Sequence, residues 1–156
     1  MYRNLLTDLV VVFVRYLSPE SLDFLWKIIA GQLQAASADM RGEKRFYKVV
    51  REMCERHPAW CAANAASLHQ LLTLGLAKAC AAGKKARLRC VAALVQAIPA
   101  DRPELIAQVA SAVAGEVMLC TKEANSKTRY APYSCVCRVC RVCRVCHMLL
   151  VVCARC

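Results

Sequence analysis

Apolar residues recur at three- and four-residue steps through almost the whole chain before residue 132. The pattern is clear in the stretches NLLTDLVVVFVRYL, SLDFLWKIIAGQL, SLHQLLTLGLAKAC and ELIAQVASAVAGEVML. Such steps place apolar side chains on one face of an α-helix, whereas a half-buried strand requires strict alternation. No pair of strand patterns competes, so the sequence predicts an all-α protein.

Prolines mark where several of these helices begin. Proline suits the first turn of a helix and disfavours helix in the preceding residue, as at Pro19, Pro58 and Pro103. Gly42 and Gly83 indicate further turns. The opening helix of each pair is expected at 19–36, 59–80 and 103–121, and the closing helix at 43–56, 84–98 and from 125 onward. Helix 5–17 would close a preceding, incomplete pair.

The spacing of these signals predicts a repeat. The prolines are 39 and 45 residues apart, and arginine followed by a bulky residue recurs every 42 residues, at Arg45, Arg87 and Arg129. This period falls within the roughly 40–47 residues of HEAT and armadillo repeats, in which each helix pair packs on its neighbours. Residues 1–131 are therefore predicted to form an α-solenoid of about three HEAT- or armadillo-like helix hairpins, incomplete at both ends.

A shared core follows from stacking these hairpins. Its expected members are Trp26, Ile29, Leu33, Leu71, Leu72, Leu76, Val91, Leu94, Val109, Val113 and Val117. Solenoids need polar capping repeats at their ends. None is recognisable here, so the chain is expected to be part of something longer.

Composition bounds the class of protein and its partners. The chain has 156 residues and is 58% hydrophobic, a content that excludes wholesale disorder. Its net charge of +11 favours phosphate-rich or acidic partners. A solvated basic face is the alternative. No apolar run is long enough to span a membrane, and residues 1–17 fit a buried helix better than a signal peptide. In a reducing compartment, Cys54, Cys61, Cys80, Cys90 and Cys120 would be free core thiols.

No catalytic motif accompanies this pattern. His57 precedes a proline at a helix end, where capping is the default role, and His69 lies in an apolar helix. The segment AAGKK at 81–85 is a helix–helix turn rather than a phosphate loop, although it could hold a phosphate at the next helix N-terminus. We expect neither an enzyme nor a cofactor nor a small-molecule substrate.

One stretch carries a more specific resemblance. EVMLCTKEANSKTR, at 116–129, is similar to a segment of the ribosomal RNA-processing protein 12 family, large HEAT-repeat factors of ribosome biogenesis. KKARLRCVAALVQAIP, at 84–99, resembles the preceding helix, and FYKVVREM, at 46–53, is compatible with the family. The resemblance implies a noncatalytic scaffold of the nucleus and nucleolus that binds precursor ribosomal particles, rRNA and assembly or export proteins. An importin-like adaptor that binds protein cargo is the alternative.

Basic residues cluster at the starts of the predicted closing helices. They are Lys84, Lys85, Arg87, Arg89, Lys127 and Arg129. On neighbouring repeats these helix starts would align as a ridge able to contact RNA phosphates. Alternatively, Arg87 and Arg129 form ion pairs between repeats with carboxylates such as Asp101 or Glu123.

The last part of the chain, 132–156, differs from everything before it. Pro132 interrupts the expected helix, and Cys-Arg-Val then recurs in threes, a period that matches neither helix nor strand. A GT-rich nucleotide repeat read as coding sequence accounts for this period, and the segment is expected to be poorly structured and separate from the fold. The alternatives are an interaction tail or a thiolate metal site at Cys137, Cys140, Cys143 and Cys146, which lacks the long loop usual between CxxC pairs.

Overall fold

The computed structural model describes residues 2–35, 40–74 and 81–121, and within these ranges every regular element is an α-helix. The helices are α1 (Tyr2–Val14), α2 (Pro19–Ala35), α3 (Met40–Arg56), α4 (Pro58–Ala63), α5 (Ala65–Leu74), α6 (Ala81–Ala97) and α7 (Pro103–Thr121). The prediction of an all-α protein is thus confirmed over the described residues. The segment from 122 onward, with the Cys-Arg-Val repeats, lies outside them.

Proline marks three helix starts as predicted, at α2, α4 and α7. Other boundaries differ from the prediction. Helix α1 ends at Val14 rather than residue 17, because the amides of Tyr16 and Leu17 bond the carbonyls three residues back and tighten the last turn. Gly42 and Gly83 lie inside α3 and α6 and not in turns, since a helix tolerates an isolated glycine at about 1 kcal/mol.

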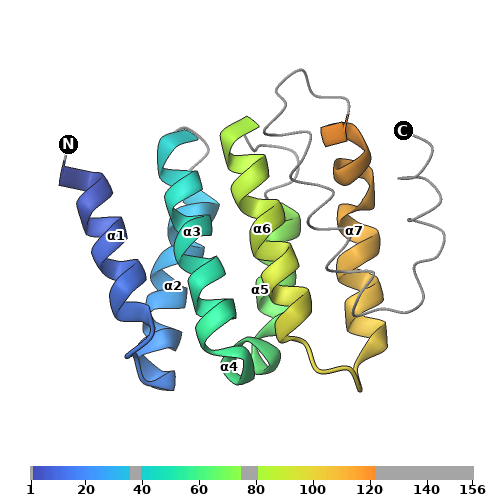
Figure 1. Ribbon diagram of the computed structural model, residues 1–156, viewed down its shortest axis with the longest axis horizontal. Helices are drawn as coiled ribbons and strands as arrows, with labels where there is room; N and C mark the ends of the chain where they lie inside the picture. Colours follow the sequence, from blue (N-terminus) through green and yellow to red (C-terminus); the bar gives the residue numbers. More distant parts are fainter. Residues whose placement is uncertain (1, 36–39, 75–80, 122–156) are drawn as a thin grey trace.

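The helix expected at 59–80 is divided at Asn64 into α4 and α5. Both the backbone amide and the side-chain amide of Asn64 donate to the carbonyl of Trp60, at 3.0 and 3.1 Å. Asparagine competes in this way for backbone groups that would otherwise continue the helical ladder. The short helix α4 consequently turns beneath the ends of α3 and α6 before α5 begins (Figure 1).

The helices form two layers. Helices α1, α3 and α6 run side by side in the same direction, with α2 and α5 behind them in the opposite direction (Figure 1). Helix α3 packs most extensively against α6 and also contacts α1, while α7 contacts both α5 and α6. The chain therefore crosses between the layers from α1 to α2, from α2 to α3 and from α5 to α6. Helix α6 is the most enclosed helix, since most of its described side chains are buried.

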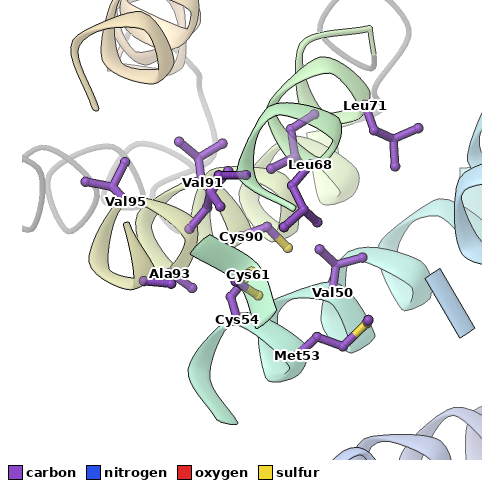
Figure 2. Close-up of a cluster of buried hydrophobic side chains, with 14 of the residues drawn as sticks. Val50, Met53, Cys54, Cys61, Leu68, Leu71, Cys90, Val91, Ala93 and Val95 are labelled. Carbon is purple, nitrogen blue, oxygen red and sulfur yellow. The ribbon is translucent and has the colours of Figure 1, made fainter. Parts of the chain in front are cut away.

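The core fills the space between the layers (Figure 2). Val50 and Met53 of α3, Leu68 of α5 and Val91 of α6 are almost completely buried. The predicted core is largely confirmed: the buried members are Trp26, Ile29, Leu71, Leu72, Val91, Leu94, Val109 and Val113. Leu33 is half-buried against this core, whereas Leu76 and the side chain of Val117 lie outside the described residues.

Both tryptophans join helices through polar atoms as well as through their rings. Trp26 Nε1 of α2 donates to Ser67 Oγ of α5 at 3.2 Å, and Trp60 Nε1 of α4 donates to Asp23 Oδ1 of α2 at 2.7 Å. A buried indole N–H without an acceptor would be costly. These bonds therefore fix how α2 sits against α4 and α5.

Replacing Leu68 tests the central position of this core. Leu68 has no exposed surface and Gln70, on the same helix, is exposed. We expect Leu68→Ala to lower the free energy of unfolding by about 2–5 kcal/mol through lost burial and a residual cavity. Gln70→Ala should change it by less than about 0.5 kcal/mol. Urea unfolding followed by circular dichroism measures both; equal midpoints would contradict the core described.

Candidate nucleic-acid interface

Basic side chains that are exposed or half-buried gather on the open side of α3 and α6. On α3 a stripe at helical spacing contains Lys44, Lys48 and Arg51, and on α6 the corresponding stripe contains Lys85 and Arg89. Helix α3 has α1 and α6 at its sides and α2 behind it, so these residues face outward from the layer. We call these five residues the basic face.

The two stripes lie at the same level of the molecule. Helices α3 and α6 begin at the same end and run in parallel (Figure 1). Their register is shown by Cys90 Sγ of α6, which donates to the carbonyl of Tyr47 on α3 at 2.6 Å. Lys44 and Lys48, on either side of Tyr47 along α3, are therefore level with the turn of α6 that carries Arg89.

Two members of the basic face have acidic neighbours. Lys48 Nζ lies 2.5 Å from Asp8 Oδ1 of α1, and Arg51 Nε lies 3.6 Å from Glu55 Oε1 on its own helix. Exposed pairs of this kind contribute at most about 1 kcal/mol and exchange readily for another anion. Lys44, Lys85 and Arg89 form no ion pair with any carboxylate among the described residues. The basic face thus keeps a surplus of positive charge.

Arg87 does not belong to this surface, which corrects its assignment from the sequence. It has no exposed area, and its Nη1 donates to the carbonyl of Leu72 at 2.9 Å. Leu72 lies in the last turn of α5, where carbonyls lack helical partners and the helix dipole favours a cation. Arg87 therefore joins α6 to the end of α5. The alternative prediction was an ion pair between Arg87 and Asp101. The bond described for Arg87 is instead the one to the Leu72 carbonyl, and Asp101 is exposed.

The other residues of the predicted ridge divide into three groups. Arg89 is exposed, Lys84 and Lys85 are half-buried, and Lys127 and Arg129 lie outside the described residues. The sequence reasoning missed Lys44, Lys48 and Arg51. Their four- and three-residue spacing along a helix was the available signal, but only the pairing of α3 with α6 shows that they extend the same surface.

Three cysteines lie together in the core, as expected for free thiols. Cys54, Cys61 and Cys90 come from α3, α4 and α6 and are all buried (Figure 2). Hydrogen bonding with Cys61, together with burial, raises the pKa of the Cys54 thiol well above its ordinary value. Burial likewise raises the pKa of Cys90. Neutral, enclosed thiols are poor nucleophiles and poor metal ligands.

Metal binding has no candidate within the described part of the chain. There, no three His, Cys, Asp or Glu side chains come close enough to hold an ion. The alternative site at Cys137, Cys140, Cys143 and Cys146 lies outside that part, as do Cys80 and the side chain of Cys120. His57 is accounted for structurally, because its Nε2 lies 2.7 Å from the carbonyl of Val14 at the end of α1.

Comparison with known proteins finds no relative of this chain. No protein-family model matches the chain, and no curated protein or solved structure is significantly similar to it. Within residues 2–35, 40–74 and 81–121, no helix combines the length and apolarity needed to cross a membrane. The role of the basic face is therefore argued from its geometry alone.

Arg87 and Arg89 provide a matched pair for separating support of the fold from surface charge. Arg87→Ala removes a buried guanidinium and strands the Leu72 carbonyl, so we expect a loss of about 2–4 kcal/mol in the free energy of unfolding. Arg89→Ala should change it by less than about 0.5 kcal/mol. Chemical denaturation measures both, and a stable Arg87→Ala variant would contradict the buried role.

The core thiols should resist alkylation in the folded protein. We expect iodoacetamide to leave Cys54, Cys61 and Cys90 unmodified under native, reducing conditions and to modify them in denaturant, as mapped by peptide mass spectrometry. Because the folded-state pKa values of Cys54 and Cys90 are raised, these thiols ionise first in the unfolded chain as the pH rises past 9.0, the ordinary thiol pKa. Stability should therefore fall above that pH. Fast native labelling would contradict this arrangement.

Proposed function

We propose that this protein is a noncatalytic helical-repeat scaffold that binds RNA through the phosphate backbone, in the manner of the ribosomal RNA-processing protein 12 family. The observation that carries the proposal is the basic face, in which neighbouring parallel helices place their positive residues on one open side at one level. Phosphate contacts of this kind position an RNA without reading its bases.

Contacts between helices support a repeat of about 42 residues. Of the six side-chain bonds described between different helices or their flanking residues, four connect residues 40 to 43 positions apart: Trp26 with Ser67, Lys48 with Asp8, His57 with Val14, and Cys90 with Tyr47. A stack of similar helix pairs brings equivalent positions of successive repeats side by side. The alternation of helices between two layers is what HEAT-like hairpins would produce.

The charge distribution favours RNA over an acidic protein as the main partner. Positive residues recur along two adjacent helices at spacings that a row of phosphates can follow. The chain's overall charge of +11 adds long-range attraction to a polyanion. The partners we propose are rRNA and assembly proteins within precursor ribosomal particles, and the site of action is the nucleolus and nucleus.

Charge reversal of the basic face tests this function. We expect Lys44→Glu, Lys85→Glu and Arg89→Glu together to weaken binding to an rRNA hairpin at least about tenfold. The salt dependence of binding should also become less steep, because fewer phosphate contacts mean that fewer counterions are released when the RNA binds. Fluorescence anisotropy across a salt series measures both quantities. Circular dichroism should show unchanged helicity, since these residues are exposed or half-buried.

A matched control separates the basic face from net charge. Arg102→Glu with Gln32→Glu, Gln34→Glu, Gln70→Glu and Gln108→Glu makes the same total charge change at exposed positions away from the basic face. This variant should lose markedly less affinity. Equal losses in the two variants would contradict a defined interface. A wild-type chain that ignores RNA but binds a Ran-type GTPase or cargo peptide would instead support the importin-like alternative.

A further inference from the structure

Helix α1 is apolar on two opposite faces, and only one of them is covered. Val14 is buried, and Val10, Val11 and Leu17 pack against the core. The opposite side remains exposed and carries large apolar residues at helical spacing, Leu5, Leu6, Leu9, Val12 and Phe13, and the exposed Tyr16 follows in the turn after the helix. A helix that is apolar all round is normally enclosed on all sides.

Two further large apolar residues are exposed on α2, at the same end of the molecule. Phe24 and Ile28 lie one turn apart on α2, which follows α1 directly and occupies the same end of the layers (Figure 1). We call these eight residues the α1–α2 apolar face. Their exposed fractions range from 46% to 75%.

The size of the α1–α2 apolar face matches what a stable protein contact needs. Large apolar side chains offer roughly 150–200 Å² each when fully exposed, so the eight together present on the order of 800 Å². The largest apolar patch of a typical monomer covers about 300–600 Å². A standard interface buries about 800 Å² on each partner, so these residues offer an area of the size that one side of a dimer needs.

The charges around this face indicate the kind of partner. The charged residues between positions 5 and 28 are Asp8, Arg15, Glu20, Asp23 and Lys27, a net charge of −1 against +11 for the whole chain. Asp8 is also paired with Lys48 of α3, so the surroundings of this face are close to neutral and do not attract nucleic acid. Two copies of this face meet with little repulsion, and the bases Arg15 and Lys27 of one copy can neutralise the acids Glu20 and Asp23 of the other.

We propose that the α1–α2 apolar face is the contact through which two copies of this chain form a symmetric dimer. The two α1 helices pack against each other across a two-fold axis, with Leu5, Leu9 and Val12 in the middle of the contact. The apolar stripe at four- and three-residue steps is the pattern by which paired helices interlock. The second copy thereby supplies the covering layer that α3 supplies on the other side of α1.

The interface is tested on the full chain in reducing buffer, which prevents association through disulfides. We expect light scattering after size-exclusion chromatography to give the mass of a dimer at micromolar concentration. Leu9→Glu with Phe13→Glu should weaken self-association at least about 100-fold and give a monomer, because buried anchors at an interface centre carry most of its affinity. Both residues are exposed, so helicity by circular dichroism should not change.

Ala107→Glu with Gln108→Glu is the control, since it adds the same charge at exposed positions of α7. This variant should remain a dimer. A wild-type chain that stays monomeric up to high micromolar concentration would overturn the proposal, as would a dimer that survives in the Leu9→Glu, Phe13→Glu variant. Loss of the dimer in both double variants would also overturn it, because the α1–α2 apolar face would then not be the cause.

Discussion

The packing of α6 against α3 is the contact on which the rest of the structure depends. Helix α6 also touches α4, α5 and α7, so every helix except α1 and α2 is placed by it directly. Its residues from Cys90 to Val95 are all buried, which is unusual for a helix that begins with several charged positions. The two halves of α6 therefore have different roles. The second half holds the layers together, and the first half carries part of the basic face.

Arg87 and Arg89 show how little separates a structural from a surface role. They are two positions apart, which on an α-helix is a rotation of roughly 200°. One guanidinium is directed to the end of α5 and the other to solvent. Both serve the proposed interface, because the buried one fixes α6 relative to α5 while the exposed one supplies charge. An arginine suits the buried position because its guanidinium reaches the Leu72 carbonyl while its stem packs in the core.

Much of the fold follows from local rules, and the differences have physical causes. Pro103 and the apolar spacing after it predicted α7 from 103 to 121, as observed. The break at Asn64 could not be foreseen, because it depends on the side chain choosing the Trp60 carbonyl over solvent. Of the site, Arg89 was predicted correctly as exposed, but Arg87 was not recognised as buried. Lys44 was overlooked because it shares a face with Lys85 of α6 only through the packing of α3 against α6. These two helices are far apart in the sequence, so no local pattern encodes their pairing.

The short reach of the contacts between helices has a consequence for how the protein folds. The side-chain hydrogen bonds described between helices span at most 43 residues, and α1 has no extensive contact beyond α3. Loop-closure entropy grows with the separation of the joined residues, so such a chain can order itself stepwise from a local nucleus. Helices α3 and α6 provide the densest nucleus, and outer helices add to it one at a time. Local opening therefore begins at the ends of the stack, where α1 can detach while α5, α6 and α7 keep their packing.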